Sequence, residues 1–163
     1  MDQSSLIFHY FHAANSAGLA RYQTQILNVL RPCLLLYGLY SDPENRGRIT
    51  LRPAMRVRAR VIFVKQIAQG QGISYGHTFV APRDMTVATI PMGYSDGYFR
   101  SLSNKSSVLI GGQRCPVLGR VTMDQIVVDV SAVDKVHIGQ DVVILGRQRD
   151  EVITADELAD HAG

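Results

Sequence analysis

The chain has 163 residues, of which 46% are hydrophobic and 19% are charged, the composition of a globular protein long enough to form a core. Its net charge of +3 is too small to indicate a nucleic-acid-binding protein. Cys33 and Cys115 have neither a metal-site nor a redox-motif spacing, so we expect no metal site. The sequence has neither a signal-peptide pattern nor an apolar run of about 18 residues. We therefore expect a cytoplasmic protein with no membrane partner.

The first forty residues predict a βαβ unit. Residues 6–14 (LIFHYFHAA) are typical of a buried strand, apolar residues recur at helical spacing from Ala17 to Leu30, and residues 33–37 (CLLLY) suit a second buried strand. Such a unit implies a parallel sheet or barrel, but its strands need neighbours on both sides, so it cannot form a domain by itself. The polar, turn-rich residues 41–50 then indicate a linker.

Residues 51–163 predict an antiparallel β-domain. Many short runs of alternating apolar residues recur here, and this spacing favours an antiparallel barrel or sandwich. The runs lie at residues 53–65, 77–81, 85–92, 107–111, 114–118, 125–130 and 141–145. Gly111 and Gly112 between two runs indicate a hairpin, and Thr154 with Glu157 forms a capping box that begins a helix.

A basic stretch leaves a second function open. Arg56, Arg58 and Arg60 alternate with apolar residues, which predicts a strand with a solvated basic face and a buried apolar face. A small β-barrel with such a face could be a non-catalytic binding or scaffold module for nucleic acid or an acidic partner. Against nucleic acid, the aromatic residues do not interleave with the arginines as a base-stacking platform requires.

Tyr75 is the first candidate for chemistry, because it lies between Ser74 and Gly76 at the start of an expected strand. A phenol is a poor base at neutral pH unless its anion is stabilised, and Gly76 lets a ligand approach the backbone. The alternative is a tyrosine at the rim of the barrel that buries its ring and leaves its hydroxyl in water.

Four further positions have both a functional and a structural interpretation. Ser16 lies where the helix begins, which indicates either an anion site or an ordinary N-terminal cap. Arg31 follows the same helix and suits the negative end of its dipole. Asp96 with Gly97 suits a bend, and Met123 suits a core position.

Three segments, in order along the chain, resemble the C-terminal half of alanine racemase, a pyridoxal phosphate enzyme. They are residues 72–79 (GISYGHTF), 90–98 (IPMGYSDGY) and 119–125 (GRVTMDQ), and the resemblance extends from about residue 9 to residue 160. It implies a mainly β chain in which residues 1–40 are a βαβ remnant of the C-terminal end of a pyridoxal phosphate-binding (β/α)8 barrel. Residues 51–163 are then the antiparallel, β-barrel-like domain of the family, truncated at its C-terminus.

The resemblance also implies an activity, a cofactor and a partner. The family consists of isomerases that interconvert L- and D-alanine with pyridoxal phosphate, using two bases on opposite faces of the substrate. It implies a homodimer whose active sites are shared between the subunits. Serine racemases share this architecture, so the implied substrate class is a small amino acid.

By the same resemblance, Tyr75 matches one of the two bases. Ser16 matches the serine that contacts the cofactor phosphate, and Arg31 matches the arginine that points at the pyridine nitrogen. Cys33 stands where the family usually has a glycine whose backbone amide meets the phosphate, and Leu34 is the next residue of this cofactor segment.

The resemblance assigns five residues to the substrate. Tyr94 matches a residue at the narrow substrate entrance, facing the cofactor of the partner subunit, and the backbone amide of Met123 matches the group that binds the substrate carboxylate. Arg100 and Arg120 match entrance positions, where their charge attracts a carboxylate. Asp96 lies in the same entrance segment.

The expected Schiff-base lysine has no counterpart. Lys65, Lys105 and Lys135 are the only lysines, and none lies in a Val-Lys-Ala-Asn-type segment like the one that carries this lysine in the family. The resemblance therefore implies an incomplete enzyme that does not racemise alanine by itself. Unpaired strands at residues 6–14 and 33–37 also predict association into dimers or larger assemblies.

Overall fold

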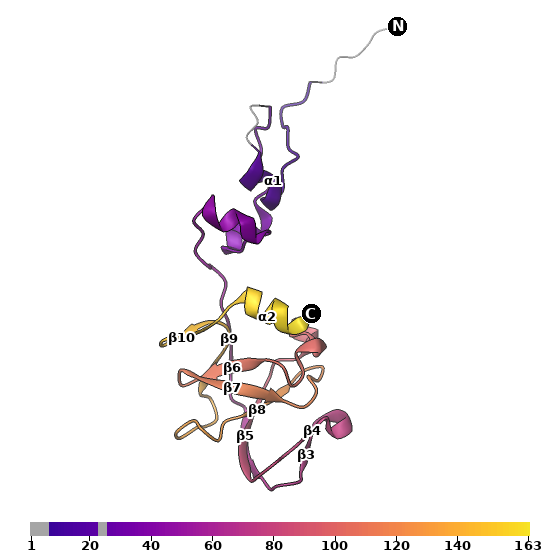
Figure 1. The fold of residues 1–163 in the computed structure, drawn as a ribbon, viewed down its shortest axis with the longest axis vertical. Helices are drawn as coiled ribbons and strands as arrows, with labels where there is room; N and C mark the ends of the chain where they lie inside the picture. Colours follow the sequence, from indigo (N-terminus) through magenta and orange to yellow (C-terminus); the bar gives the residue numbers. More distant parts are fainter. Residues whose placement is uncertain (1–6, 23–25) are drawn as a thin grey trace. The chain divides into compact units, whose positions relative to one another are not determined.

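The computed structural model describes residues 7–22 and 26–163 of the chain. These residues belong to two compact units, an N-terminal unit (Met1–Met55) and a β unit (Arg56–Gly163), shown in Figure 1. Within the described residues, no helix has both the length and the apolar character to cross a membrane.

The β unit is an antiparallel sheet with short helical turns. Its strands are β1 (Val57–Arg60), β2 (Phe63–Ile67), β3 (Gly72–Ile73), β4 (Phe79–Val80), β5 (Met85–Ile90), β6 (Ser107–Ile110), β7 (Gln113–Leu118), β8 (Ile126–Asp129), β9 (Asp141–Gln148) and β10 (Glu151–Ile153). The main sheet has the order β1-β9-β6-β7-β8-β5-β2, with β10 paired to β9, while β3 and β4 form a separate two-stranded sheet. The prediction of a mainly β, antiparallel, barrel-like domain is confirmed.

Strand β5 joins two apolar cores. Ala88 and Ile90 on one face belong to the main core, whereas Met85 and Val87 on the other face belong to a second cluster with Ile73 of β3. Because successive side chains of a strand point to opposite faces, both faces of β5 are buried. The second core therefore lies under the β3–β4 segment.

Two local predictions in the β unit are confirmed. Gly111 and Gly112 connect β6 to β7, with φ of +64° and +83°, as a two-residue hairpin turn with two left-handed positions requires. Arg58 and Arg60 are exposed on β1 while Val57 and Ala59 pack against the main core.

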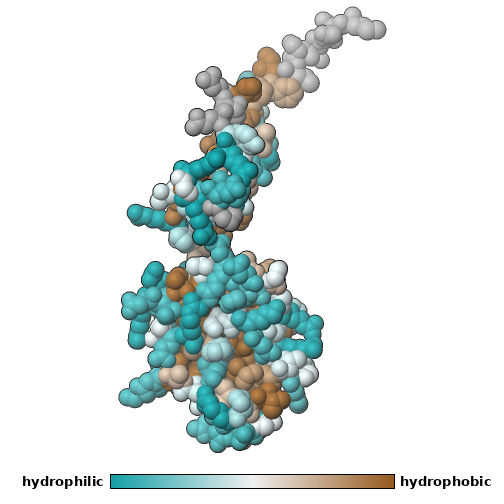
Figure 2. Space-filling model, in the orientation of Figure 1, coloured by the Kyte–Doolittle hydropathy of each residue, from teal (hydrophilic) through white to brown (hydrophobic). Residues whose placement is uncertain are grey.

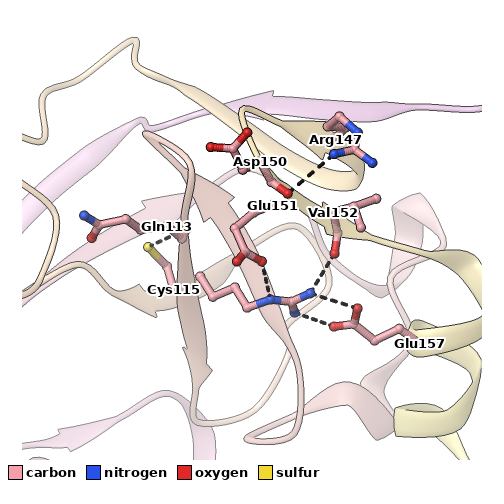
Figure 3. A network of polar contacts seen from close by, with 8 residues as sticks. Gln113, Cys115, Arg147, Asp150, Glu151, Val152 and Glu157 are labelled. Atoms are coloured by element: carbon pink, nitrogen blue, oxygen red, sulfur yellow. Dashed lines mark hydrogen bonds and ion pairs between the residues drawn. The ribbon is translucent and has the colours of Figure 1, made fainter.

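The helix α2 (Ala155–Ala162) is fastened to the sheet by Arg114 of β7. The Thr154 hydroxyl caps the helix by accepting from the amide of Glu157 at 3.1 Å, which confirms one half of the predicted capping box; the Glu157 carboxylate, which a capping box directs back to the Thr154 amide, binds another group. The Glu157 carboxylate binds the Arg114 guanidinium at 2.6 and 3.1 Å (Figure 3). Arg114 also donates to Glu151 at 2.9 Å and to the carbonyl of Val152 at 2.6 Å, so one side chain ties β10 and α2 to the sheet.

The N-terminal unit corrects the βαβ prediction. It contains α1 (Ser16–Arg21) and two 3-10 helices, η1 (Cys33–Tyr37) and η2 (Pro43–Gly47). Residues 7–14 have no strand, the segment at 33–37 is helical, and the expected helix ends at Arg21; residues 6 and 23–25 of those predictions lie outside the described part.

The physical reason is that the described residues of this unit, 7–22 and 26–55, contain no strand that could pair with these segments. An extended segment leaves its backbone amides and carbonyls unpaired unless neighbouring strands bind them. Residues 33–37 instead pair locally, with the Leu35 amide donating to Pro32 at 2.9 Å and the Gly38 amide to Leu35 at 3.1 Å.

The N-terminal unit exposes many large apolar side chains. Brown atoms are visible at its surface in Figure 2. The exposed residues are Ile7, Phe8, Tyr10, Phe11, Tyr22, Ile26, Leu30, Leu34, Leu36 and Tyr37. This unit therefore leaves much apolar side-chain surface exposed to solvent.

We expect Leu109→Ala to lower the free energy of unfolding of the β unit by about 2–5 kcal/mol. Leu109 is fully buried in the cluster that Leu158 of α2 packs against, so the change leaves a cavity under the helix. Chemical denaturation followed by circular dichroism measures the effect. Ile138→Ala, at an exposed position, is the control and should change stability by less than about 0.5 kcal/mol. Equal effects of the two variants would contradict the core assignment.

The Arg114–Glu157 contact also predicts a pH dependence. Hydrogen bonds from Arg114 lower the pKa of the Glu157 carboxyl below its usual range. A depressed folded-state pKa contributes stability that is present above the unfolded-state pKa and is lost as pH falls through the folded-state pKa. Glu157→Gln should therefore reduce the loss of stability between neutral and acid pH, measured by denaturant titrations across that range. Asp160→Asn, on the exposed side of α2, is the control and should leave the pH profile unchanged.

Candidate active site

Tyr75 lies at the surface on a strained turn. It begins η3 (Tyr75–His77), between β3 and β4, and its side chain is 73% exposed. Three residues around it have positive φ: Ser74 at +61°, Gly76 at +69° and His77 at +44°. Side chains other than glycine rarely adopt this conformation, and such strain persists only where the surroundings enforce it. The turn therefore restricts the backbone at Tyr75 and leaves its side chain at the surface.

The Tyr75 turn packs closely against residues 119 and 120. The Ser74 hydroxyl donates to the carbonyl of Arg120 at 2.7 Å. A Cβ on Gly119 would lie 2.6 Å from the carbonyl oxygen of Ile73, so only glycine fits there. A Cβ on Gly76 would lie 3.7 Å from the Arg120 guanidinium, which places this charge beside the Tyr75 turn. Two predicted site residues, Tyr75 and Arg120, thus lie together.

Tyr94 and Met123 form a second pair, in which Tyr94 lies on the connection between β5 and β6 and Met123 lies on the connection between β7 and β8. Tyr94 begins η4 (Tyr94–Asp96), and its amide donates to the carbonyl of Thr122 at 3.0 Å. The Ser95 amide donates to the carbonyl of Met123 at 3.0 Å, and a Cβ on Gly93 would lie only 2.2 Å from that oxygen. Tyr94 and Met123 are 49% and 53% exposed, so both remain accessible.

Two predicted entrance residues differ in what they contact. The Asp96 carboxylate accepts from the amide of Gly93 at 2.9 Å and so stabilises its own turn. This agrees with the prediction that Asp96 and Gly97 form a bend. Arg100 begins η5 (Arg100–Leu102) and is exposed.

Asn104 contacts the Tyr75 turn, and the sequence did not indicate it. Its side-chain oxygen accepts from the amide of Gly119 at 2.6 Å. Its side-chain nitrogen donates to the hydroxyl of Thr78 at 3.3 Å and to the carbonyl of Thr78 at 3.4 Å. The available sequence signal, an asparagine in a turn-rich loop, indicates a local bend and not a contact with residues far along the chain.

The N-terminal unit brings together three of the residues predicted to bind the cofactor. Ser16 is 4% exposed; its hydroxyl donates to the carbonyl of Pro32 at 2.6 Å and accepts from the amide of Leu34 at 3.1 Å. Cys33, between these partners, has φ of +44°. We call Ser16, Cys33 and Leu34 the serine cradle. The fourth predicted residue, Arg31, donates to the carbonyl of Ala13 at 3.2 Å.

The left-handed backbone at Cys33 is one that glycine, the residue expected here from the resemblance, adopts readily. Glycine takes this conformation without steric strain, whereas a side chain costs about 1–2 kcal/mol. The cysteine therefore keeps the backbone shape of the cradle and adds an exposed thiol to it.

One lysine lies close to the Tyr75 turn. Lys65 of β2 lines a pocket together with Gly72 and Ser74, on the approach to the Tyr75 turn. Over residues 7–22 and 26–163, no three histidine, cysteine, aspartate or glutamate residues gather closely enough to hold a metal ion.

The sequence of this chain is similar to a known family profile and to the sequences of characterised proteins. The sequence profile of the family described as "Alanine racemase, C-terminal domain" matches residues 54–163. The alanine racemase of Nostoc sp. is 46% identical over 149 residues, which cover 91% of this chain and 39% of that protein. The alanine racemase of Carboxydothermus hydrogenoformans is 43% identical over 155 residues, covering 94% and 42%.

Solved structures give the same picture. The crystal structure of alanine racemase from Bacillus anthracis with bound L-Ala-P superposes with a TM-score of 0.84 at 38% identity, covering 94% of this chain and 40% of that one. Alanine racemase from Oenococcus oeni gives a TM-score of 0.83 at 30% identity, covering 98% and 45%. The chain spans about two-fifths of the length of the curated relatives it matches.

The serine cradle predicts that a phosphate group protects Cys33 from alkylation. Cys33 is exposed and Cys115 is buried, and burial raises the pKa of the Cys115 thiol to about 12, so iodoacetamide should react at Cys33. Pyridoxal phosphate should slow this reaction several-fold, whereas pyridoxal, which lacks the phosphate, should not. Peptide mass spectrometry measures both rates.

Ser16→Ala is the matched variant for this experiment. It removes the hydroxyl of the cradle and should abolish the protection by pyridoxal phosphate. Equal protection by both ligands would contradict a phosphate site at the cradle.

Proposed function

The chain belongs to the alanine racemase family, and from this premise we propose that it supplies the tyrosine base and part of the cofactor site of an enzyme that interconverts L- and D-alanine. The observation that carries the proposal is the exposed Tyr75 phenol, on a strained turn beside the charge of Arg120. A group that moves a proton at a substrate must reach it, and this phenol is accessible.

Tyr75 acts at the α-carbon of the substrate from one side. Its oxygen takes the α-proton from one enantiomer and returns a proton when the reaction runs in the opposite direction. A second base on the other face completes the inversion, because removal and return on opposite faces exchange the two configurations. Arg120 beside the turn and the exposed Arg100 attract the negatively charged carboxylate.

Met123 and Tyr94 hold the substrate end of the site. The backbone amide of Met123 binds the substrate carboxylate, and Tyr94 narrows the entrance. Their support is the close packing of the η4 turn on residues 122 and 123, which fixes both groups relative to one backbone segment. The Met123 side chain is secondary in this arrangement, so Met123→Leu has a small effect.

The serine cradle suits the phosphate of pyridoxal phosphate in its donor chemistry. The Ser16 hydroxyl and the Leu34 backbone amide are both groups that can donate hydrogen bonds to phosphate oxygens. In the structure the Leu34 amide donates to Ser16 at 3.1 Å and the Ser16 hydroxyl donates to Pro32 at 2.6 Å, so a bound phosphate would take over both donors. Arg31, always charged, would face the pyridine nitrogen and keep it unprotonated. When bound, this cofactor delocalises the negative charge that proton removal leaves at the α-carbon.

The rest of the active site comes from outside the residues of this chain in our proposal. The Schiff-base lysine belongs to the part of the relatives' length that this chain does not span, and residues 1–163 do not racemise alanine by themselves. The assembled enzyme is a cytoplasmic homodimer in which Tyr75 of one subunit faces the cofactor of the other. The exposed apolar side chains of the N-terminal unit support the proposal that further barrel residues are needed, because a complete barrel would cover these side chains.

We expect Tyr75→Phe to lower kcat by about 10²- to 10⁴-fold, the usual contribution of a general acid–base group. The assay uses this chain fused behind the lysine-bearing N-terminal part of the Nostoc sp. relative, with pyridoxal phosphate added. In deuterium oxide, the variant should still exchange the α-proton of one enantiomer and lose exchange of the other, since only one of the two bases is removed.

Tyr98→Phe is the control, because it deletes a hydroxyl that is buried against Ser106 in the same unit. It should retain exchange of both enantiomers. The unfused chain with pyridoxal phosphate should show no racemisation. Unchanged kcat in the Tyr75→Phe fusion, or turnover by the unfused chain, would refute the corresponding part of the proposal.

A further inference from the structure

We propose that Asn104 is a positioning residue that holds the Tyr75 turn in its outward conformation. This inference rests on the proposed role of Tyr75 as a base. Asn104 lies in the loop between η5 and β6 and reaches the Tyr75 turn through its side chain alone. Its amide group uses both ends: the oxygen accepts from Gly119, and the nitrogen donates to Thr78.

The Tyr75 turn is tied to one backbone segment at both of its ends. Ser74, before Tyr75, donates to the carbonyl of Arg120 at 2.7 Å. The hydroxyl of Thr78, the residue that follows η3, accepts a hydrogen bond from the Asn104 side-chain nitrogen. The side-chain oxygen of Asn104 accepts from the Gly119 amide at 2.6 Å. The turn is therefore closed against residues 119 and 120 directly at one end and through Asn104 at the other.

The loop that carries Asn104 also fixes the backbone around Arg120. The Ser103 hydroxyl accepts from the amide of Val121 at 3.0 Å, and Asn104 accepts from the amide of Gly119, so adjacent residues bind both sides of Arg120. Asn104 itself has φ of +59°, a conformation that asparagine tolerates better than most residues. The loop thus positions two groups of the candidate site at once.

Strain makes this tie necessary. Ser74 and His77 keep left-handed conformations that favour glycine, and the turn around them is exposed. A strained, exposed segment opens locally at a smaller free-energy cost than the whole domain. Loss of the Asn104 side chain should therefore release the turn, and with it Tyr75, before the β unit unfolds.

Two variants of the full chain separate the hydrogen bonds from the backbone conformation. Asn104→Gly keeps the left-handed backbone and deletes the side chain, and Asn104→Asp keeps the acceptor for Gly119 and loses the donor to Thr78. Both are labelled with ¹⁵N and carry 3-fluorotyrosine at position 75. The measurements are the exchange rate of the Gly119 amide proton and the ¹⁹F shift and line width of the label.

In Asn104→Gly, the Gly119 amide should exchange at least about tenfold faster, because its acceptor is lost, and the ¹⁹F signal should move and change width. In Asn104→Asp, Gly119 should keep its slow exchange while the ¹⁹F signal still changes, since the tie to Thr78 is broken. A purely structural role would not produce this separation. In the active fusion, both variants should lower kcat with little change in KM.

Lys135→Gly is the matched control, because Lys135 also has a left-handed backbone, with φ of +52°, in the loop between β8 and β9. It should change neither signal. A ¹⁹F signal identical to that of the parent chain in both Asn104 variants would overturn the proposal, and if Asn104→Gly fails to fold, Asn104→Asp decides. None of the spectroscopic signals requires racemisation, so an active Tyr75→Phe fusion would refute the catalytic role without affecting this result.

Discussion

The close packing of residues 119–123 against two surface turns is the contact on which the candidate site depends. At one end, Gly119 leaves room for the carbonyl of Ile73 beside the Tyr75 turn, and at the other, Gly93 leaves room for the carbonyl of Met123 beside the Tyr94 turn. Both glycines permit a backbone approach that any side chain would block. One connection between β7 and β8 therefore contacts the turn of the proposed base Tyr75 and carries both the Arg120 charge and the Met123 amide that we propose binds the substrate carboxylate.

The sequence predicted the β unit well because the signals there are local. The hairpin at Gly111 and Gly112 needs only two left-handed residues, and the α2 cap needs only Thr154 and the next turn of helix. The strand predicted at residues 33–37 was wrong because a strand depends on partners from elsewhere, which an apolar run cannot reveal. Motif resemblance singled out Tyr75, but Asn104 contacts its turn only through the fold, and no spacing in the sequence marks such a contact.

The basic face predicted for β1 is less charged in the structure than the run of arginines in the sequence indicates. Arg58 forms an ion pair with Asp141 of β9, so part of the charge that alternation predicted is neutralised by the neighbouring strand. Arg114, which carries no motif, binds two carboxylates and a carbonyl and joins three elements. The sequence does not distinguish these arginines, but in the structure Arg114 joins β7 to β10 and α2, whereas Arg58 pairs with the neighbouring strand at the surface.

The left-handed conformations of Ser74 and His77 have a consequence for how this domain could be redesigned. A designer who wanted only a stable β-domain on this backbone would place glycine at both positions, because relieving the steric strain is an easy gain in stability. Glycine would also widen the range of conformations open to the turn. The residues present keep the steric strain and confine the turn backbone to fewer conformations than glycine would allow.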